Sequence, residues 1–194
     1  YAGMVYAVAR QRTGTRETAE EVAQNVFITL SRKASNLHRD ANLGGWLHRV
    51  TMLESAAVRR AEMRRQRRHE KLAIMKETER PDEAPHDEAL SLLDEAVQKL
   101  KASDRDLLFR RFLEGLSFAE IGKHYGITEV SGRKRVSRVL QKLSGLMSKQ
   151  GVAVSAVALG LTMTAHWSKG APIGLAQSLS KAALSGATAT TSNL

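Results

Sequence analysis

The chain contains no cysteine, only 3 prolines and 5% aromatic residues among its 194 residues. Without thiols it can form neither a disulfide nor a thiolate metal site, and a reducing cytoplasm is compatible with this composition. The 6 histidines lack the spacing of a metal site, and the sequence has neither a phosphate-binding loop nor a nucleophile motif. We therefore expect no enzyme activity, no metal and no cofactor. With no secretory signal at Tyr1, we expect a cytoplasmic protein.

Acidic residues are scarce and are absent from the end of the chain. The 30 Lys and Arg residues outnumber the 20 Asp and Glu residues, which gives a formal net charge of +10. The charge is +7 over residues 1–69, −6 over 70–95, +7 over 96–150 and +2 over 151–194. Two basic blocks around an acidic spacer indicate two domains that face a polyanion, either nucleic acid or an anionic membrane surface.

Alternating strand patterns are also missing, whereas apolar residues at helical spacing run through most of the chain. We therefore predict an all-α protein. The pattern at Tyr1 is already that of a helix interior, which suggests that an N-terminal segment precedes it. This first helix ends at Gly14, and Thr15 or Thr18 can cap the second. A third helix begins at about Trp46 and becomes rich in arginine toward its end.

Helices resume at about Leu90, after an acidic stretch with two prolines that is predicted to be a flexible linker. The segment SDRD at 103–106 predicts a helix start, and SFAE at 117–120 fits a capping box. Gly126 ends that helix and Thr128 caps the next one. The last two helices are therefore predicted to form a helix-turn-helix unit.

In such a unit the second helix enters the major groove of DNA. Arginine can read guanine edges, whereas lysine and serine mostly contact phosphates. Small residues should lie where the two helices touch, namely Ala119, Gly122 and Gly126. Apolar residues should pack the pair together, namely Ile121, Ile127, Val130 and Val136. The candidate DNA contacts are Thr128, Glu129, Ser131, Arg133, Lys134, Arg135, Ser137 and Arg138. A solvated basic helix face that binds nothing is the alternative interpretation.

Three stretches carry a resemblance to a known family. "AEEVAQNVF", "LGGWLHRV" and "RDLLFRRFLEGLSFAEIGKHYGITEVSGRKRVSRVLQKL" resemble, in their order, the extracytoplasmic-function (group IV) sigma factors of the sigma-70 family. The resemblance covers about residues 1–150 and implies a bacterial initiation factor with two small helical domains. It implies a three-helix region two over residues 1–72, a flexible linker over 73–87 and a four-helix region four over 88–150. Residues 151–194 form an apolar C-terminal extension beyond these domains.

The resemblance also implies roles for individual residues. The helix "TAEEVAQNVF" would dock on core RNA polymerase through Glu20, Glu21, Gln24 and Asn25. The loop "SNLHRD" would capture an unstacked base of the minus-ten promoter element, and the third helix would line the same DNA strand. The implied minus-ten contacts are Asn36, Leu37, His38, Arg39, His48, Arg49, Arg59, Arg60, Arg64 and Arg65. Trp46 is interpreted as a core anchor. Region four would bind the polymerase flap and read the minus-thirty-five element.

The extension contains "GVAVSAVALGLTMTAHW", a run of 17 uncharged residues. A helix that spans a bilayer needs about 20 apolar residues, and serine, threonine and histidine dilute this run. We favour a short helical extension in the form of a helical hairpin that packs on region four or docks another protein, with disorder as one alternative. Membrane contact through residues 151–167 is the less favoured alternative, and a regulatory role is a hypothesis.

These observations predict a sigma factor that binds core RNA polymerase and directs it to promoter DNA. The resemblance also implies an anti-sigma protein or another regulator as a partner. The alternative is a stand-alone helix-turn-helix transcriptional regulator with residues 1–72 as a dimerisation or sensor domain. A third alternative is a membrane-tethered adaptor in which the extension dominates.

Overall fold

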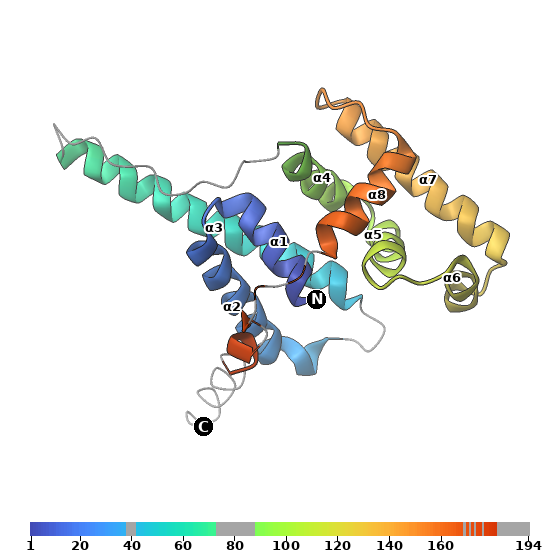
Figure 1. The fold of residues 1–194 in the computed structure, drawn as a ribbon, viewed down its shortest axis with the longest axis horizontal. Helices are drawn as coiled ribbons and strands as arrows, with labels where there is room; N and C mark the ends of the chain where they lie inside the picture. The colour runs from blue at the N-terminus through green and yellow to red at the C-terminus, as the bar shows by residue number, and fades with distance from the viewer. Residues whose placement is uncertain are drawn as a thin grey trace.

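All secondary structure that is described in this protein is helical, as predicted (Figure 1). The computed structural model describes residues 1–37, 42–72, 88–168, 170, 172, 174, 175 and 177–181. The linker predicted over residues 73–87 lies outside this part of the chain, as do His38 and Arg39 of the predicted minus-ten loop.

Region two is built from α1 (Ala2–Thr13), α2 (Arg16–Lys33), the short turn η1 (Ala34–Asn36) and α3 (Leu43–Leu72). Gly14 ends α1 in the left-handed conformation, with φ of 79°, and its N–H donates to the carbonyl of Arg10. Of the two threonines predicted to cap α2, Thr15 does so: its hydroxyl accepts the N–H of Thr18. The three long helices contact one another around a core of small aliphatic side chains.

The third helix starts earlier than the sequence pattern predicts. It begins at Leu43, because the side chain of Asn42 accepts the N–H of Gly45 and caps the first turn. Two consecutive glycines, Gly44 and Gly45, weaken the helical pattern in the sequence, but they allow close packing. A Cβ at Gly44 would lie 3.1 Å from the side chain of Leu113.

Region four consists of four consecutive helical parts and a π-helical turn. They are α4 (Glu88–Lys99), α5 (Ala102–Leu108), η2 (Phe109–Leu113), α6 (Phe118–Tyr125) and α7 (Glu129–Ser148). The helix cap predicted at 103–106 was wrong. The helix α5 begins at Ala102, and Lys101 precedes it without a side-chain hydrogen bond to its first turn. The carboxylate of Asp104 instead accepts a hydrogen bond from Nζ of Lys142 at 2.8 Å.

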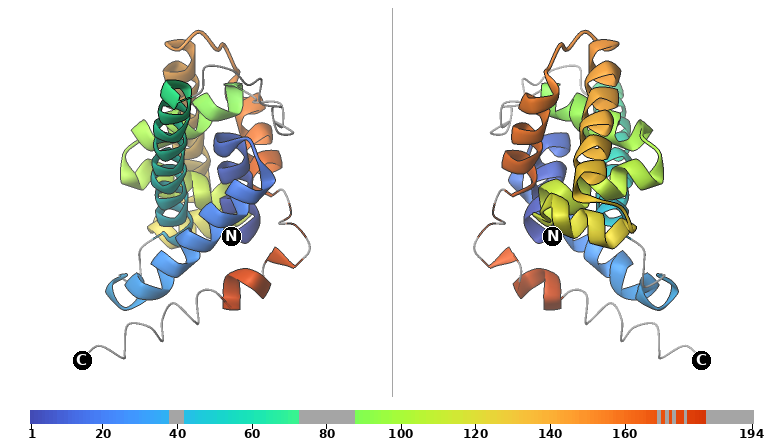
Figure 2. Two further views of the ribbon diagram at one scale, coloured as in Figure 1. Left: turned by 90° about the vertical axis from the view of Figure 1, so that its left-hand side faces the viewer. Right: turned by 90° about the vertical axis from the view of Figure 1, so that its right-hand side faces the viewer.

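A further helix, α8 (Ala156–Trp167), follows region four. The side chain of Ser155 caps it by accepting the N–H of Ala158. Of the helical hairpin predicted to pack on region four, the described elements contain one helix, α8, which contacts α7 and η2 and also contacts α1 of region two. Figure 1 shows α8 between α1 and α7, and both views of Figure 2 show α8 beside α1. Within the described residues, the helices lack the length and hydrophobicity that a membrane span requires.

Buried side chains from both regions and from α8 belong to one continuous cluster. At its centre the rings of Phe109 and Trp167 stack with their centroids 4.5 Å apart, and His48 of α3 lies 5.3 Å from Phe109. A residue of η2 therefore packs between a residue of region two and a residue of the C-terminal extension.

The two arginine-rich surfaces lie far apart. In Figure 1 the C-terminal end of α3 projects at one end of the long axis, and the turn between α6 and α7 lies at the other. The described structure therefore presents one basic surface at each end of the molecule.

Candidate nucleic-acid interface

The turn between α6 and α7 has the geometry that the sequence predicts. Ser117 accepts the N–H of Glu120, and the Glu120 carboxylate accepts the N–H of Ser117 at 2.7 Å, which completes the capping box. This hydrogen bonding lowers the pKa of Glu120. Gly126 ends α6 in the left-handed conformation with φ of 64°. The hydroxyl of Thr128 then accepts the N–H of Ser131 and caps α7.

Glycine is required at the point where the two helices cross. A Cβ at Gly122 would lie 2.7 Å from the carbonyl oxygen of Ile127, closer than side-chain carbons approach. A Cβ at Gly132 would lie 3.3 Å from the side chain of Ile121 and 3.4 Å from the carbonyl of Phe118. Sequence reasoning missed Gly132, although a glycine in the first turn of a strongly capped helix was a usable signal.

Two of the predicted packing residues lie elsewhere. Ala119 is exposed, and Val130 is 62% exposed, so neither contributes to the crossing of the helices. Ile121 and Val136 are buried, as predicted. The core face of α7 continues through Val139 and Leu143, which lie three and seven residues after Val136 and thus on the same side of the helix.

The exposed side of α7 carries most of the predicted DNA contacts. Thr128, Glu129, Ser131, Arg133, Lys134, Ser137 and Arg138 are exposed. Arg133 is held in place by an ion pair with Glu129 at 3.0 Å and by the ring of Phe118 at 5.1 Å. Arg135 is different, because it is half-buried and its guanidinium lies 4.8 Å from the ring centroid of Tyr125. Arg135 therefore contributes to the packing of α6 on α7 as well as to the charge.

Polar contacts fix α6 to the rest of region four. The hydroxyl of Tyr125 donates to the carboxylate of Asp106, which also pairs with Nε of Arg110 at 3.2 Å. Burial and this hydrogen bond raise the pKa of Tyr125, so its hydroxyl stays a donor at all ordinary pH values. These contacts therefore fix the position of α6 relative to α5 in the free protein.

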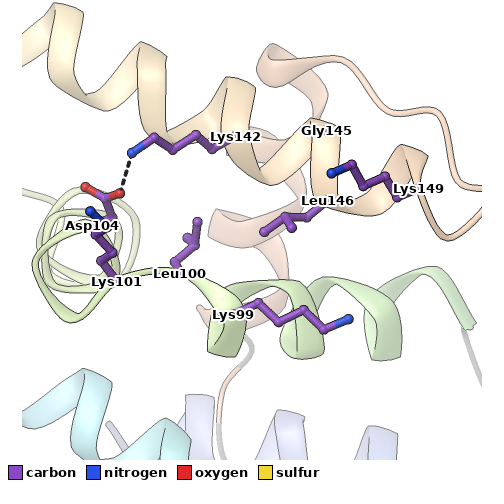
Figure 3. Close-up of a pocket in the computed structure, with 8 residues that line it drawn as sticks. All are labelled: Lys99, Leu100, Lys101, Asp104, Lys142, Gly145, Leu146 and Lys149. Atoms are coloured by element: carbon purple, nitrogen blue, oxygen red, sulfur yellow. Dashed lines mark hydrogen bonds and ion pairs between the residues drawn. The ribbon is translucent and has the colours of Figure 1, made fainter.

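The opposite end of α7 is also basic. A cleft of about 360 Å³ lies between the α4–α5 junction and α7, and four lysines line it around the apolar floor of Leu100 and Leu146 (Figure 3). Lys142 pairs with Asp104, whereas the lysines Lys99, Lys101 and Lys149 have no acidic partner among the described residues. Lys142 lies about one turn, and Lys149 about three turns, beyond Arg138, the last residue of α7 that is expected to contact DNA.

The predicted polymerase-docking residues lie on one face of α2. Glu21 is exposed, and Glu20, Gln24 and Asn25 are half-buried. Glu20 accepts a hydrogen bond from Nε of Arg16 at 2.8 Å. The i, i+4 spacing of Glu20 and Gln24 places both on the same side of the helix as Glu21.

The predicted minus-ten contacts differ in how far they are exposed to solvent. Leu37 is half-buried after η1, and nothing is described of the side chain of Asn36. Trp46, interpreted as a core anchor, is half-buried and packs against the core. The arginines of α3 that belong to the predicted set and are described are exposed, namely Arg49, Arg59, Arg60, Arg64 and Arg65.

His48 does not face outward as predicted. It is fully buried, with Nε2 2.8 Å from Asp94 and Nδ1 2.6 Å from the amide nitrogen of Gln98. Burial alone would raise the pKa of Asp94, but hydrogen bonds from His166 and His48 outweigh it and lower the pKa to about 2. The sequence pattern missed this role because both partners of His48 lie in a different region of the chain.

No group of three or more His, Asp or Glu side chains among the described residues could hold a metal ion. His48, Asp94 and His166 form a bridge of hydrogen bonds. The described structure thus combines a helix-turn-helix whose second helix, α7, exposes cations with a second basic helix, α3, in the other region.

Comparisons with known proteins agree with this arrangement. Residues 1–69 match the family described as Sigma-70 region 2, and residues 90–143 match Sigma-70, region 4. The RNA polymerase sigma factor CarQ of Myxococcus xanthus is 30% identical over 141 residues, which cover 71% of this chain and 79% of that protein. The ECF RNA polymerase sigma factor SigE of Mycolicibacterium smegmatis is 29% identical over 153 residues, which cover 77% of this chain.

The chain spans 59% of the length of SigE. Among solved structures, the sigma factor RpoE of Bartonella quintana, in complex with the anti-sigma factor NepR, matches at 21% identity. That match covers 74% of this chain and 89% of the RpoE chain, with a TM-score of 0.33, which is too low to compare the placement of the two regions.

Proposed function

The chain belongs to the sigma-70 family, among its extracytoplasmic-function sigma factors, and on this premise we propose that it binds core RNA polymerase and directs it to promoter DNA for initiation. The observation that carries the proposal is the combination, in one chain, of a region-two helix with an acidic and amide face and a region-four helix-turn-helix with exposed cations. The polymerase supplies the chemistry, so the chain needs no catalytic group. Its site of action is then the cytoplasm.

In this proposal region two performs two tasks. The face of α2 that carries Glu20, Glu21 and Gln24 docks on the polymerase. The exposed arginines of α3, such as Arg59 and Arg60, hold the DNA strand of the minus-ten element through its phosphates.

Region four reads the minus-thirty-five element through α7. Arg133 is positioned before DNA arrives, since Glu129 and Phe118 hold its side chain. A guanidinium that is already oriented loses little conformational entropy when it forms a bidentate contact with guanine. Lys134 and Arg138 are exposed on the same helix and contribute phosphate contacts. On family grounds we add an anti-sigma protein or another regulator as a further partner.

The test of polymerase docking is a pull-down of purified bacterial core RNA polymerase by the full chain. A variant that combines Glu20→Ala, Glu21→Ala and Gln24→Ala should lose binding. The matched control combines Glu54→Ala and Glu62→Ala, which remove the same number of acids from α3 and should leave binding unchanged.

Failure of the parent chain to bind polymerase would contradict the proposal. If the parent instead bound promoter duplex tightly on its own, the stand-alone helix-turn-helix regulator would replace the sigma factor as the best interpretation.

A further inference from the structure

The helix α8 packs against a surface that is formed by both regions, which we call its seat. It contacts α1 of region two and η2 and α7 of region four. Leu159, Met163 and Trp167 are at most 1% exposed and recur every four residues, which places them on one face of the helix. The opposite face carries Val157 and Leu161, which are 75% and 71% exposed. The helix is therefore buried on one side only, and its exposed side is also apolar.

A polar bridge joins the same three parts of the chain. Asp94 of α4 is fully buried and lies 2.8 Å from Nε2 of His48 in α3 and 3.4 Å from Nε2 of His166 in α8. The stacked rings of Phe109 and Trp167 lie beside it. The contact between the regions is thus completed by residues of the C-terminal extension.

The closed arrangement covers part of α3 that the proposed function needs. His48 is fully buried on the first half of the helix, against Asp94 and Gln98 of α4. Arg49 lies in a cleft whose other wall is formed by α5, including Ala102 and Arg105. The strand of the minus-ten element cannot reach His48 while Asp94 and Gln98 of α4 cover it, and α5 narrows the approach to Arg49.

The seat is also imperfect. Nδ1 of His166 and Nε1 of Trp167 are buried without a hydrogen-bond partner among the described atoms. Unpaired buried polar groups cost free energy, and folded proteins contain few of them. Water would form hydrogen bonds with both groups if α8 left its seat. These hydrogen bonds would offset part of the free energy that is lost when the apolar side chains of α8 are exposed.

From these observations we propose that α8 is an intramolecular clasp. It holds region two against region four in a closed form, and promoter opening requires that α8 leave its seat. This inference rests on the proposed sigma function, because it assigns that function to the open form only. It gives the C-terminal extension the task of restraining the two DNA-binding regions that precede it.

The test uses full-chain variants that differ only on α8. Met163→Glu places a carboxylate on the buried face and should release the helix, whereas Ala165→Glu places the same group on the exposed side. Because the chain has no cysteine, the exposed residues Ala57 of α3 and Ser148 of α7 can be labelled specifically after Ala57→Cys and Ser148→Cys substitution. The distance between these labels, measured by double electron–electron resonance, reports whether the regions separate.

We expect one short distance for the parent and for Ala165→Glu, and a longer, broader distribution for Met163→Glu. We also expect Met163→Glu to give several-fold more run-off transcript than the parent with the same core polymerase and promoter. An unchanged distance distribution, or separation without a gain in transcript, would overturn the clasp.

Two further measurements keep the result decisive. If Met163→Glu fails to fold, as judged by circular dichroism, Gly160→Leu takes its place, because a Cβ at Gly160 already lies 3.1 Å from the ring of Phe112. The pull-down of core polymerase by every variant separates the two proposals. Loss of polymerase binding in all of them refutes the sigma function, whereas binding by all of them with unchanged label distances refutes the clasp alone.

Discussion

Single residues determine whether α6 and α7 can cross. The backbone of Ile127 passes directly over Gly122, and the space there admits only a hydrogen atom. Gly145 lies on α7, the other helix of the pair, with nothing within 4 Å of the position of its missing Cβ. Backbone atoms surround the missing Cβ of Gly122, whereas the same position at Gly145 is open. The two glycines therefore form a matched pair for substitution.

We expect Gly122→Ala to lower the free energy of unfolding by about 1–3 kcal/mol, the usual cost of added volume in a packed contact. Gly145→Ala should raise it by about 0.5–1 kcal/mol, because alanine loses less conformational entropy in a helix than glycine. Urea unfolding followed by circular dichroism measures both. Equal effects of the two substitutions would show that the close approach at Gly122 does not exist in solution.

Asp94 makes the stability of the protein sensitive to acid. Its pKa is about 2 in the folded chain, against an ordinary value of 3.8. Because the folded pKa is the lower one, the stabilisation is complete above pH 4 and is lost as the pH falls toward 2. The shift corresponds to about 2 kcal/mol at neutral pH.

Denaturant unfolding of the parent between pH 6 and pH 3 should therefore show a loss of stability that begins near pH 4. Asp94→Asn should be less stable than the parent at pH 6, with a weaker dependence on pH in this window. A variant with the same acid dependence as the parent would place the responsible carboxylate elsewhere.

For single residues, the sequence predicted contacts between neighbours in the chain well and contacts between residues far apart in the chain poorly. The capping box at Ser117 and the cap at Thr128 are correct, because a cap is a contact within four residues. The burial of His48 was missed, because its partners Asp94 and Gln98 lie 46 and 50 residues away. A solvated and a buried histidine look alike in a sequence.

At the scale of elements, periodicity predicted the helices, whereas the resemblance to a known family implied the two regions and their order. The helix-turn-helix was predicted because its spacing is fixed by short-range geometry. The start of α3 was misplaced because Gly44 and Gly45 interrupt the helical pattern, whereas Asn42 caps the helix before them. The π-helical turn η2 has no sequence signal, and it matters because Phe109 at its start contacts Trp167.

The helix α7 should bind DNA with one half only. We expect Lys134→Ala and Arg138→Ala each to weaken binding of minus-thirty-five promoter DNA by the polymerase holoenzyme. Each should also reduce the slope of log affinity against log salt by about one, since each phosphate contact releases about one counterion. Fluorescence anisotropy at several salt concentrations measures this slope.

The control is Lys149→Ala, which removes the same charge from the far end of α7, in the cleft of Figure 3. Its salt slope should match that of the parent. A decrease as large as that of Lys134→Ala would mean that the whole helix attracts DNA by charge alone, without a defined reading end.

At the scale of the whole molecule, the two regions, which match two different regions of the sigma-70 family, share one buried cluster. The sequence predicted both regions from their motifs, but it could not predict that they pack together. That contact is made by residues far apart in the chain, such as His48 and Asp94, and α8 adds to it.

We expect the full chain to unfold in one calorimetric transition, because the common core couples the two regions. Met163→Glu should divide the transition into two, one for each region, since release of α8 removes shared contacts. The control Ala165→Glu should keep a single transition. Two transitions in the parent chain would mean that the regions are independent in solution.

The position of α8 in the chain has a consequence for synthesis. Every element that α8 contacts lies before it, so the ribosome completes both DNA-binding regions first. At about 5–20 residues per second, Trp167 follows the end of α7 by a few seconds. Each newly made chain therefore passes through a brief stage in which both regions are present and the helix that joins them is not.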